Sequence, residues 1–313
     1  MMKQIRKILP RVSSAVLTLL AATVMAEPAV AADDRLVELS PYAGYRLDVF
    51  EFQIAGNLEG TNPNVLSEVE WRDMEILEVG LAGRAALPFG LAFRTNGGYG
   101  WIFKGENRDS DYAGNNRTLE FSRSLSDAGD GYVWHAQGGA GYRFTLLDGD
   151  LALTPLLGYS EREQHLTIFD GHWVIPRGGG RIHGLDSSYK TRWHTAWAGL
   201  DAAWDWRDFR FSGAFEYHRG WFEAWGNWNL RRDLAHPVSL YDEADANGWT
   251  TTGVFEWRAH DRVSIGARAG LRIWITEEGK AYQYKADGRI SVTRLNHAKW
   301  YSASWSATAT FHF

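Results

Sequence analysis

The last fourteen residues of the chain decide its fold. They read Trp300-Tyr-Ser-Ala-Ser-Trp-Ser-Ala-Thr-Ala-Thr-Phe-His-Phe313, with apolar side chains alternating with Ser, Thr and His. Seven apolar residues, from Tyr301 to Phe313, therefore share one face of an extended chain. Since successive side chains of a β-strand point to opposite sides, this alternation predicts a strand with one apolar and one polar face.

The same alternation recurs in three earlier segments, at 93–103, 209–217 and 263–275. A soluble β-sandwich and a membrane β-barrel both produce it, because each has one wet and one apolar surface. Strand length separates the two. The segment 263–275 spans 13 residues, against about 5–6 in a typical globular strand. A strand of that length is sufficient to cross a bilayer at a tilt.

Aromatic residues and the end of the chain also favour the barrel. Membrane barrels carry aromatic girdles at both interfaces. Here aromatic residues lie near the ends of the predicted strands: Phe209, Phe211, Trp221, Trp249, Trp257 and Trp274. The terminal Phe313 resembles the C-terminal signature of bacterial outer-membrane barrels. The sequence therefore predicts an all-β transmembrane barrel in the outer membrane of a Gram-negative bacterium.

The N-terminus predicts export. Four basic residues between Lys3 and Arg11 precede the short apolar stretch 12–26, and small residues follow it. This pattern is typical of a secretory signal peptide. A membrane anchor is the alternative, but the stretch is shorter than the ~20 residues that a spanning helix needs. We expect a signal peptide at 1–32 and one outer-membrane β-barrel domain at 33–313.

The composition agrees with an exported barrel and excludes several other classes. The 313 residues include 16 Trp, 13 Tyr, 15 Phe and 33 Gly but no Cys. Lack of Cys excludes a disulfide scaffold, a thiolate metal site and a Cys nucleophile. A net charge of −5 argues against nucleic-acid binding. No later apolar run reaches the ~20 residues of a membrane helix. We expect the Trp and Tyr side chains mainly at the membrane interfaces and facing lipid.

The connections between strands predict their number. Short turns fall at 87–90, 148–150, 207–208 and 260–261, and longer polar segments lie between them. The predicted long loops are 56–64, 105–130, 171–187, 226–247 and 279–295. Nine connections give ten antiparallel strands, and the alternation of short and long places the termini and short turns on the periplasmic side.

Several charged and histidine side chains fall on the polar faces of these strands. Because a barrel of ten strands has little room for a channel, we expect them to fill its lumen as a charge network. The predicted lumen-facing residues are Arg94, His135, Arg143, Glu216, His218, Glu256, Arg258, Arg268 and Arg272.

In strand order and loop rhythm the mature chain resembles the omptins, ten-stranded outer-membrane endopeptidases of Gram-negative bacteria. The segment 105–112, Gly-Glu-Asn-Arg-Asp-Ser-Asp-Tyr, resembles the omptin Asp-x-Asp-aromatic motif after the third strand. The segment 215–223, Phe-Glu-Tyr-His-Arg-Gly-Trp-Phe-Glu, resembles the seventh strand, which leads into a catalytic Asp-x-His. The resemblance implies that Asp109 and Asp111 position a water molecule, which an Asp-held His activates against a peptide carbonyl.

The chain departs from the omptins at this second pair. An ungapped alignment puts Trp228 and Leu230 at the Asp and His positions, where neither can act as an acid or base. The nearest substitutes are Asp233 and His236. On a strand, residues three apart point to opposite faces, so only a bent loop could bring these two together. The tentative catalytic residues are Asp109, Asp111, Asp233 and His236.

Two functions therefore remain open. The chain is a divergent or inactive surface endopeptidase of the omptin (aspartic) type, or a non-catalytic barrel such as a narrow porin, an adhesin or a structural surface protein. In the second case Asp109 and Asp111 are ordinary solvated acids of a loop tip. Motifs of serine hydrolases, zinc peptidases and P-loop enzymes are missing from the sequence.

We expect no cofactor. The acids at 109, 111 and 120 and Gly114 match part of an EF-hand calcium loop, but Ala113 occupies a ligand position and the flanks predict strands. Lipopolysaccharide is a candidate bound lipid, because arginine suits phosphate groups. Six basic residues lie in or beside the long loops: Arg177, Arg181, Lys190, Arg192, Arg231 and Arg232. A peptide or protein substrate at the extracellular mouth is the other candidate partner.

Overall fold

The computed structural model describes residues 37–313. The predicted signal peptide at 1–32 and the start of the predicted mature chain lie outside the described residues. Within 37–313 no helix is long and apolar enough to cross a membrane. The described chain forms thirteen β-strands: β1 (Val37–Ile54), β2 (Ser67–Ala86), β3 (Leu91–Gly114), β4 (Thr118–Asp127), β5 (Gly131–Tyr142), β6 (Phe144–Leu146), β7 (Leu151–Ile175), β8 (Asp186–Trp206), β9 (Phe209–Asn227), β10 (Leu240–His260), β11 (Val263–Thr276), β12 (Gly279–Tyr284) and β13 (Ile290–His312).

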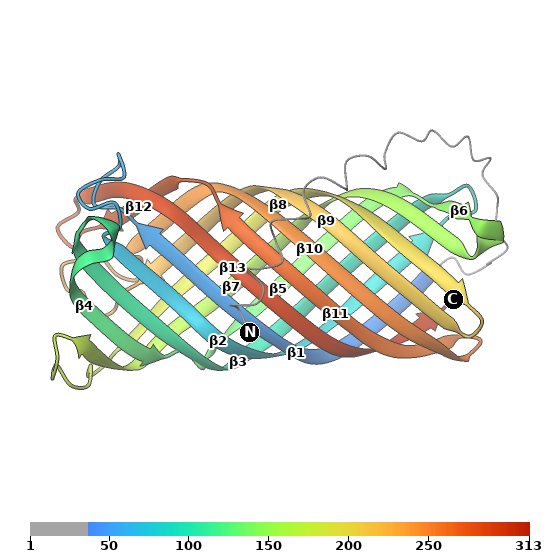
Figure 1. Ribbon diagram of the computed structural model, residues 1–313, viewed down its shortest axis with the longest axis horizontal. Helices are drawn as coiled ribbons and strands as arrows, with labels where there is room; N and C mark the ends of the chain where they lie inside the picture. The colour runs from blue at the N-terminus through green and yellow to red at the C-terminus, as the bar shows by residue number, and fades with distance from the viewer. Residues whose placement is uncertain (1–36) are drawn as a thin grey trace.

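The antiparallel sheet closes on itself, because β1 pairs with β2 on one side and with β13 on the other. Three consecutive segments, β4, β5 and β6, pair with β7 one after the other and count as one barrel strand. In the same way β11 and β12 follow one another between β10 and β13 and count as one strand. The segments therefore form a ring of ten barrel strands, which confirms the predicted fold. Figure 1 shows a cylinder with β4 and β12 at one end and the C-terminus at the other.

The short turns lie where the sequence predicted them, but most of the long loops are shorter than expected. The connection from β3 to β4 is 115–117, and that from β12 to β13 is 285–289. Strands occupy the rest of the segments 105–130 and 279–295 that were predicted as loops. Their polar residues belong to the outer faces of strands that continue beyond the membrane, and so they do not mark loops.

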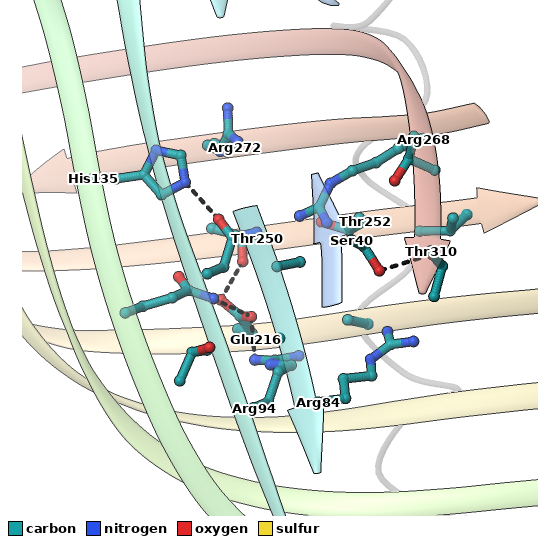
Figure 2. Close-up of a pocket in the computed structure, with 18 of the residues that line it drawn as sticks. Ser40, Arg84, Arg94, His135, Glu216, Thr250, Thr252, Arg268, Arg272 and Thr310 are labelled. Carbon is teal, nitrogen blue, oxygen red and sulfur yellow. Dashed lines mark hydrogen bonds and ion pairs between the residues drawn. The ribbon is translucent and has the colours of Figure 1, made fainter. Parts of the chain in front are cut away.

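In the half of the barrel next to the short turns, apolar side chains face outward and charged side chains fill the lumen. Arg94 forms ion pairs with Asp201 and Glu216, and His218 Nε2 lies 2.9 Å from the Glu216 carboxylate. Figure 2 shows part of this network. The predicted charge network is confirmed for seven of the nine predicted lumen residues, which form ion pairs or hydrogen bonds: Arg94, His135, Glu216, His218, Glu256, Arg258 and Arg272. The other two, Arg143 and Arg268, line cavities of the lumen.

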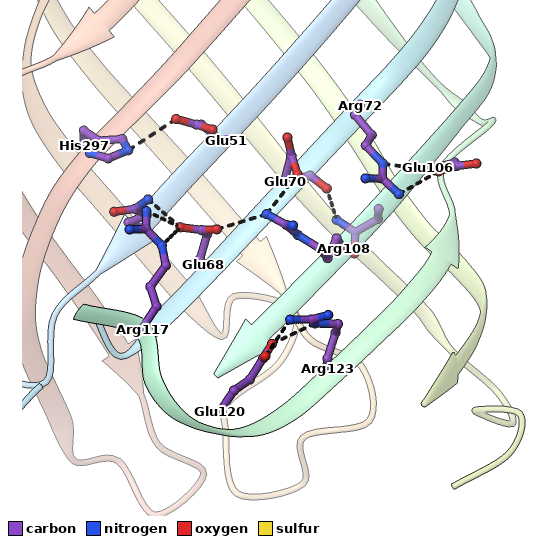
Figure 3. A network of polar contacts seen from close by, with 12 residues as sticks. Glu51, Glu68, Glu70, Arg72, Glu106, Arg108, Arg117, Glu120, Arg123 and His297 are labelled. Carbon is purple, nitrogen blue, oxygen red and sulfur yellow. Dashed lines mark hydrogen bonds and ion pairs between the residues drawn. The ribbon is translucent and has the colours of Figure 1, made fainter. Parts of the chain in front are cut away.

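The other half, which we call the upper part, exchanges the chemistry of the two faces. In β1, Tyr45 and Val49 point outward and Arg46 points inward, but beyond them Glu51 points outward and Phe50 inward. Ion pairs such as Arg108 with Glu68 and Glu70 cover the outside of this wall (Figure 3). The upper part resembles a soluble barrel, with a polar exterior around an apolar interior. It comprises residues 50–54, 67–74, 105–127, 160–194, 222–247 and 274–300.

Aromatic side chains fill the interior of the upper part. We call this group the aromatic plug: Phe50, Phe52, Trp71, Tyr189, Trp193, Phe222, Trp274 and Trp300. Each member is at most 2% exposed. The expectation that Trp and Tyr lie mainly at interfaces and facing lipid is therefore wrong for this group. Its members keep the period of two but occupy inward positions.

Candidate functional site

The upper end of β3 brings the two predicted aspartates to the mouth of the barrel. β-Bulges between β2 and β3 shift the register near Glu75. Below the bulges Ile102 points inward. Above them the inward residue is Asn107, which is 0% exposed, and the outward residue is Glu106, whose side chain is 60% exposed. Asp109 and Asp111 share the inward face with Asn107, as the prediction for an extended third strand required. They are strand residues of the inner wall, so the alternative of loop-tip acids is wrong.

Neighbouring strands hold both carboxylates. Asp111 lies opposite Ser67 of β2 and Ser122 of β4, and both hydroxyls act to lower its pKa. Ser67 and the indole of Trp228 act in the same way on Asp109, but Oδ1 of Asp109 is buried without a hydrogen-bond partner among the described residues. Burial, together with the negative charge of Asp111, raises the pKa of Asp109 above its ordinary range. Burial raises the pKa of Asp111 as well. The pair therefore holds a proton more readily than surface aspartates do.

The opposite wall of the mouth is the 228–239 connection between β9 and β10. Trp228 lies edge-on to Tyr189, with the ring centroids 6.0 Å apart, which fixes the indole above the aromatic plug. The positive charge of Arg231 acts on Asp109 and Asp111. The same guanidinium binds Asp233 through two hydrogen bonds of 2.8 and 2.7 Å. Asp233 is thus engaged by an arginine.

His236 has a different partner. Its Nδ1 lies 2.8 Å from Oδ1 of Asn227, the last residue of β9. The described contacts therefore bring Asp109 and Asp111 together and link them through Arg231 to Asp233, but they pair His236 with an amide. An Asp-held His, which the omptin mechanism needs, is not assembled among residues 37–313 by these contacts.

Sequence reasoning missed three partners of the aspartates. Ser67 and Ser122 lie on adjacent strands, and only the register between strands reveals them. Trp228 was identified as a departure from the omptin pattern, but its position beside Asp109 depends on the loop crossing the mouth. Arg231 was predicted as a lipid-binding residue, although its guanidinium is engaged with Asp233. A strand pattern carries no signal for such contacts across the barrel.

The site offers few metal ligands. Among residues 37–313 no group of three or more His, Asp or Glu side chains is arranged to hold a metal ion. The segment 109–120, considered as a calcium loop, runs through β3, a 3-10 turn at Asn115–Arg117 and β4. An EF-hand needs a loop between two helices, so the fold excludes that interpretation.

A second buried acid lies below the mouth. Asp242 of β10 is 2% exposed and accepts a 2.5 Å hydrogen bond from the hydroxyl of Tyr189. Burial raises the pKa of Asp242 from 3.8 to about 7, because the hydrogen bond offsets only part of the lost hydration. The residue belongs to the upper part, outside the membrane-spanning segments.

This pKa predicts a dependence of stability on pH. The unfolded carboxyl loses its proton near pH 3.8 and the folded one near pH 7, so the free energy of unfolding falls as the pH rises through that window. In Asp242→Asn the amide oxygen still accepts from Tyr189, and we expect this contribution to disappear. The free energy of unfolding of the variant minus that of wild type should be on the order of 2 kcal/mol larger at pH 8 than at pH 4.

Urea unfolding in lipid vesicles at several pH values measures the effect of Asp242→Asn. Asp245→Asn is the matched control, because that side chain on the same strand is 67% exposed. The control should follow wild type at every pH. A parallel shift of the Asp242→Asn curve at all pH values would show that Asp242 does not titrate in this window.

Comparison with known proteins now adds to this geometry. Residues 41–313 match a family model described as "Pom: Protochlamydia outer membrane protein". A search of curated proteins found no match. Among solved structures, the outer membrane protease OmpT from Escherichia coli is similar over 89% of this chain and 97% of its own, with a TM-score of 0.72 and 13% sequence identity.

At that identity the likeness to OmpT shows the fold, and it confirms the omptin-like barrel predicted from the sequence. The outer membrane protein OprG from Pseudomonas aeruginosa also matches, over 89% of this chain and 98% of its own, with a TM-score of 0.36 and 7% identity. A TM-score this low marks only a general similarity between barrels, whereas the OmpT match extends to the arrangement of the strands.

Proposed function

The chain belongs to the Protochlamydia outer membrane protein family, and from this premise we propose that it is a non-catalytic surface barrel with a closed lumen. As an outer-membrane β-barrel it is surrounded by membrane lipid. In the proposed function the barrel presents its upper part, with the polar outer wall and the mouth, beyond the membrane.

One observation carries the proposal. Trp228 stands where the omptin pattern has an aspartate, and its indole lies beside Asp109. The group next to the carboxylate that would position water is therefore one that cannot accept a proton. Arg231 acts on both carboxyls with its positive charge, but burial outweighs that charge and raises both pKa values. A general base must reach the proton that it removes, and His236 instead bonds to Asn227.

The aromatic plug supports the second half of the proposal. Trp193, Trp274 and Trp300 contact one another with ring centroids 5.6 to 6.3 Å apart. Arg46 and Arg162 lie directly beneath, each 5.1 Å from a ring of the plug. Packed rings above and guanidinium groups below occupy the lumen at these two levels, which supports a closed barrel over a porin.

We expect purified wild-type protein to cleave a fluorogenic peptide containing basic residues no faster than its Asp111→Ala variant does. The assay is run with and without added lipopolysaccharide over pH 5–8. Equal rates support the proposal, because Asp111 would be indispensable to an omptin-type peptidase.

Faster cleavage by wild type than by both Asp111→Ala and His236→Ala would overturn the non-catalytic proposal and establish a peptidase. Asp245→Ala serves as a matched acid removed from the site, since its side chain is 67% exposed. Planar-bilayer recordings of the same preparation test the closed lumen, and steady ion conductance would contradict it.

The second candidate function is the divergent endopeptidase. It is favoured by the inward-facing pair Asp109 and Asp111, whose raised pKa values are typical of reactive carboxyls. In that case Asp109 and Asp111 would position water, while His236 with Asp233 would have to leave their present partners to activate it. Breaking the Arg231–Asp233 contact is the cost of that movement.

Lipopolysaccharide is the proposed lipid partner. Lys190 and Arg192 lie on the outer face of β8, above the girdle position of Tyr159, where the headgroups of the outer leaflet would meet the barrel. Both bind Glu163, at 3.1 and 2.7 Å. Phosphate groups could compete for these cations, because guanidinium binds phosphate as readily as carboxylate.

A further inference from the structure

A small cavity lies in the lumen below the aromatic plug. Its volume is about 60 Å³, enough for a small ion together with water. Five arginines from four strands line it: Arg84, Arg94, Arg162, Arg268 and Arg272. Only two carboxylates, Glu216 and Glu256, share that lining. Figure 2 shows guanidinium groups approaching the space from several sides.

Three of these arginines, Arg84, Arg162 and Arg268, form no ion pair among residues 37–313, and the last two are the most informative. Arg162 is 3% exposed and donates a 2.6 Å hydrogen bond to Gln137, an uncharged acceptor. Arg268 lies over the ring of Tyr42, 5.0 Å from its centroid. Among residues 37–313 neither forms an ion pair within 4.0 Å, whereas Arg94 forms two. Buried cations are normally paired, because an unpaired charge loses its hydration without compensation.

The cavity also has unused hydrogen-bond donors. Nε of Arg94, Nε of Arg162 and Nδ2 of Asn96 are buried and have no acceptor in the described structure. All three residues line the cavity. Oδ1 of Asn96 is already occupied by His135 at 2.6 Å, so the amide presents its N–H group to the remaining space. Every unsatisfied atom of the lining is therefore a donor, and the missing group is an acceptor.

We propose that this cavity binds a small monovalent anion of the size of chloride. The anion accepts from the unsatisfied donors and balances the charge of Arg162 and Arg268. Water satisfies the donors but leaves the charge uncompensated. Entry is from the short-turn end, because a second cavity of about 80 Å³ shares Arg84 and Arg94 with the first and extends to Arg143.

Chloride dependence of stability tests the proposal. Protein in lipid vesicles is unfolded with urea in sodium chloride or sodium gluconate at equal ionic strength, so that general screening is the same. A ligand that binds only the folded state raises the unfolding midpoint. We expect a higher midpoint in chloride than in gluconate. Arg162→Gln should lose most of this difference.

Arg289→Gln is the matched control, because that arginine lies in the 285–289 loop with its side chain 82% exposed. It should keep the full chloride effect. Crystals grown in bromide supply a measurement that does not depend on the variants. We expect an anomalous peak between Arg162 and Arg268.

Equal midpoints of wild type in the two salts, or a cavity without a bromide peak, would overturn the proposal in favour of water alone. A chloride effect that persists in Arg162→Gln would also overturn it, because the ion would then bind elsewhere. If Arg162→Gln does not fold, wild-type stability in the two salts and the bromide crystal still decide. Neither result bears on catalysis at the mouth.

Discussion

Glu216→Ala is expected to lower the free energy of unfolding by about 3–5 kcal/mol, the usual loss when one member of a buried ion pair is removed. The Glu216 carboxylate is 4% exposed and pairs with Arg94. It also accepts hydrogen bonds from Thr250 at 2.6 Å and Gln137 at 3.1 Å, and it contacts His218. Alanine would leave four polar groups without their shared acceptor, three on other strands and His218 on β9 itself.

Urea unfolding of the vesicle-embedded barrel measures this loss for Glu216→Ala. Glu106→Ala is the control: it also removes a glutamate paired with an arginine, but its side chain is 60% exposed. Surface pairs contribute about 0–1 kcal/mol, so the control should stay near wild type. Combining Glu216→Leu with Arg94→Met and Asp201→Asn should recover part of the loss, because none of the three paired charges is then left buried alone. Similar values for Glu216→Ala and Glu106→Ala would contradict the network.

The barrel and its charged lumen could be predicted because their signals are local. Alternation along one strand reports its two faces, as in 300–313, and short turns count the strands. Lumen residues such as Arg94 and Glu216 follow from the polar phase of that alternation. No contact between distant segments is needed for these inferences.

The upper part was missed because the alternation continues while its meaning reverses. Along β1 the outward side chain changes from the apolar Val49 to the charged Glu51. Over the same stretch the inward side chain changes from the charged Asp48 to the apolar Phe50. A pattern of period two records the regularity but not which face meets water. Segments such as 105–130 therefore looked like polar loops, although they are mostly strands.

The candidate site was half predictable for a related reason. That Asp109 and Asp111 share a face follows from their spacing alone. The positions of Ser67 and Trp228 beside Asp109 depend on strand register and on the path of a loop more than 100 residues away. The bulges near Glu75 turn both aspartates toward the inside of the barrel, and no residue pattern in β3 predicts these bulges.

The aromatic plug leads to the second large prediction. Trp193→Ala is expected to cost about 3–5 kcal/mol, as for other buried aromatic residues replaced by alanine. Trp193 is 0% exposed and packs against Phe222, Trp274 and Trp300 at 4.6 to 6.3 Å between ring centroids. Its Nε1 has no hydrogen-bond partner among the described residues, so the loss comes from packing alone.

Adding indole distinguishes a Trp193→Ala variant that keeps a defined cavity from one whose core has collapsed. Engineered apolar cavities stay dry and bind aromatic molecules of matching size. Added indole should therefore raise the urea midpoint of the variant and leave wild type unchanged. Trp305→Ala is the control, since this tryptophan is 46% exposed on the lipid-facing surface and its loss leaves no internal space. A Trp193→Ala variant as stable as Trp305→Ala would show that the upper part is not held by its aromatic interior. Rescue by indole would show that the rings around position 193 keep their places, so that the closed lumen is a property of rigid packing.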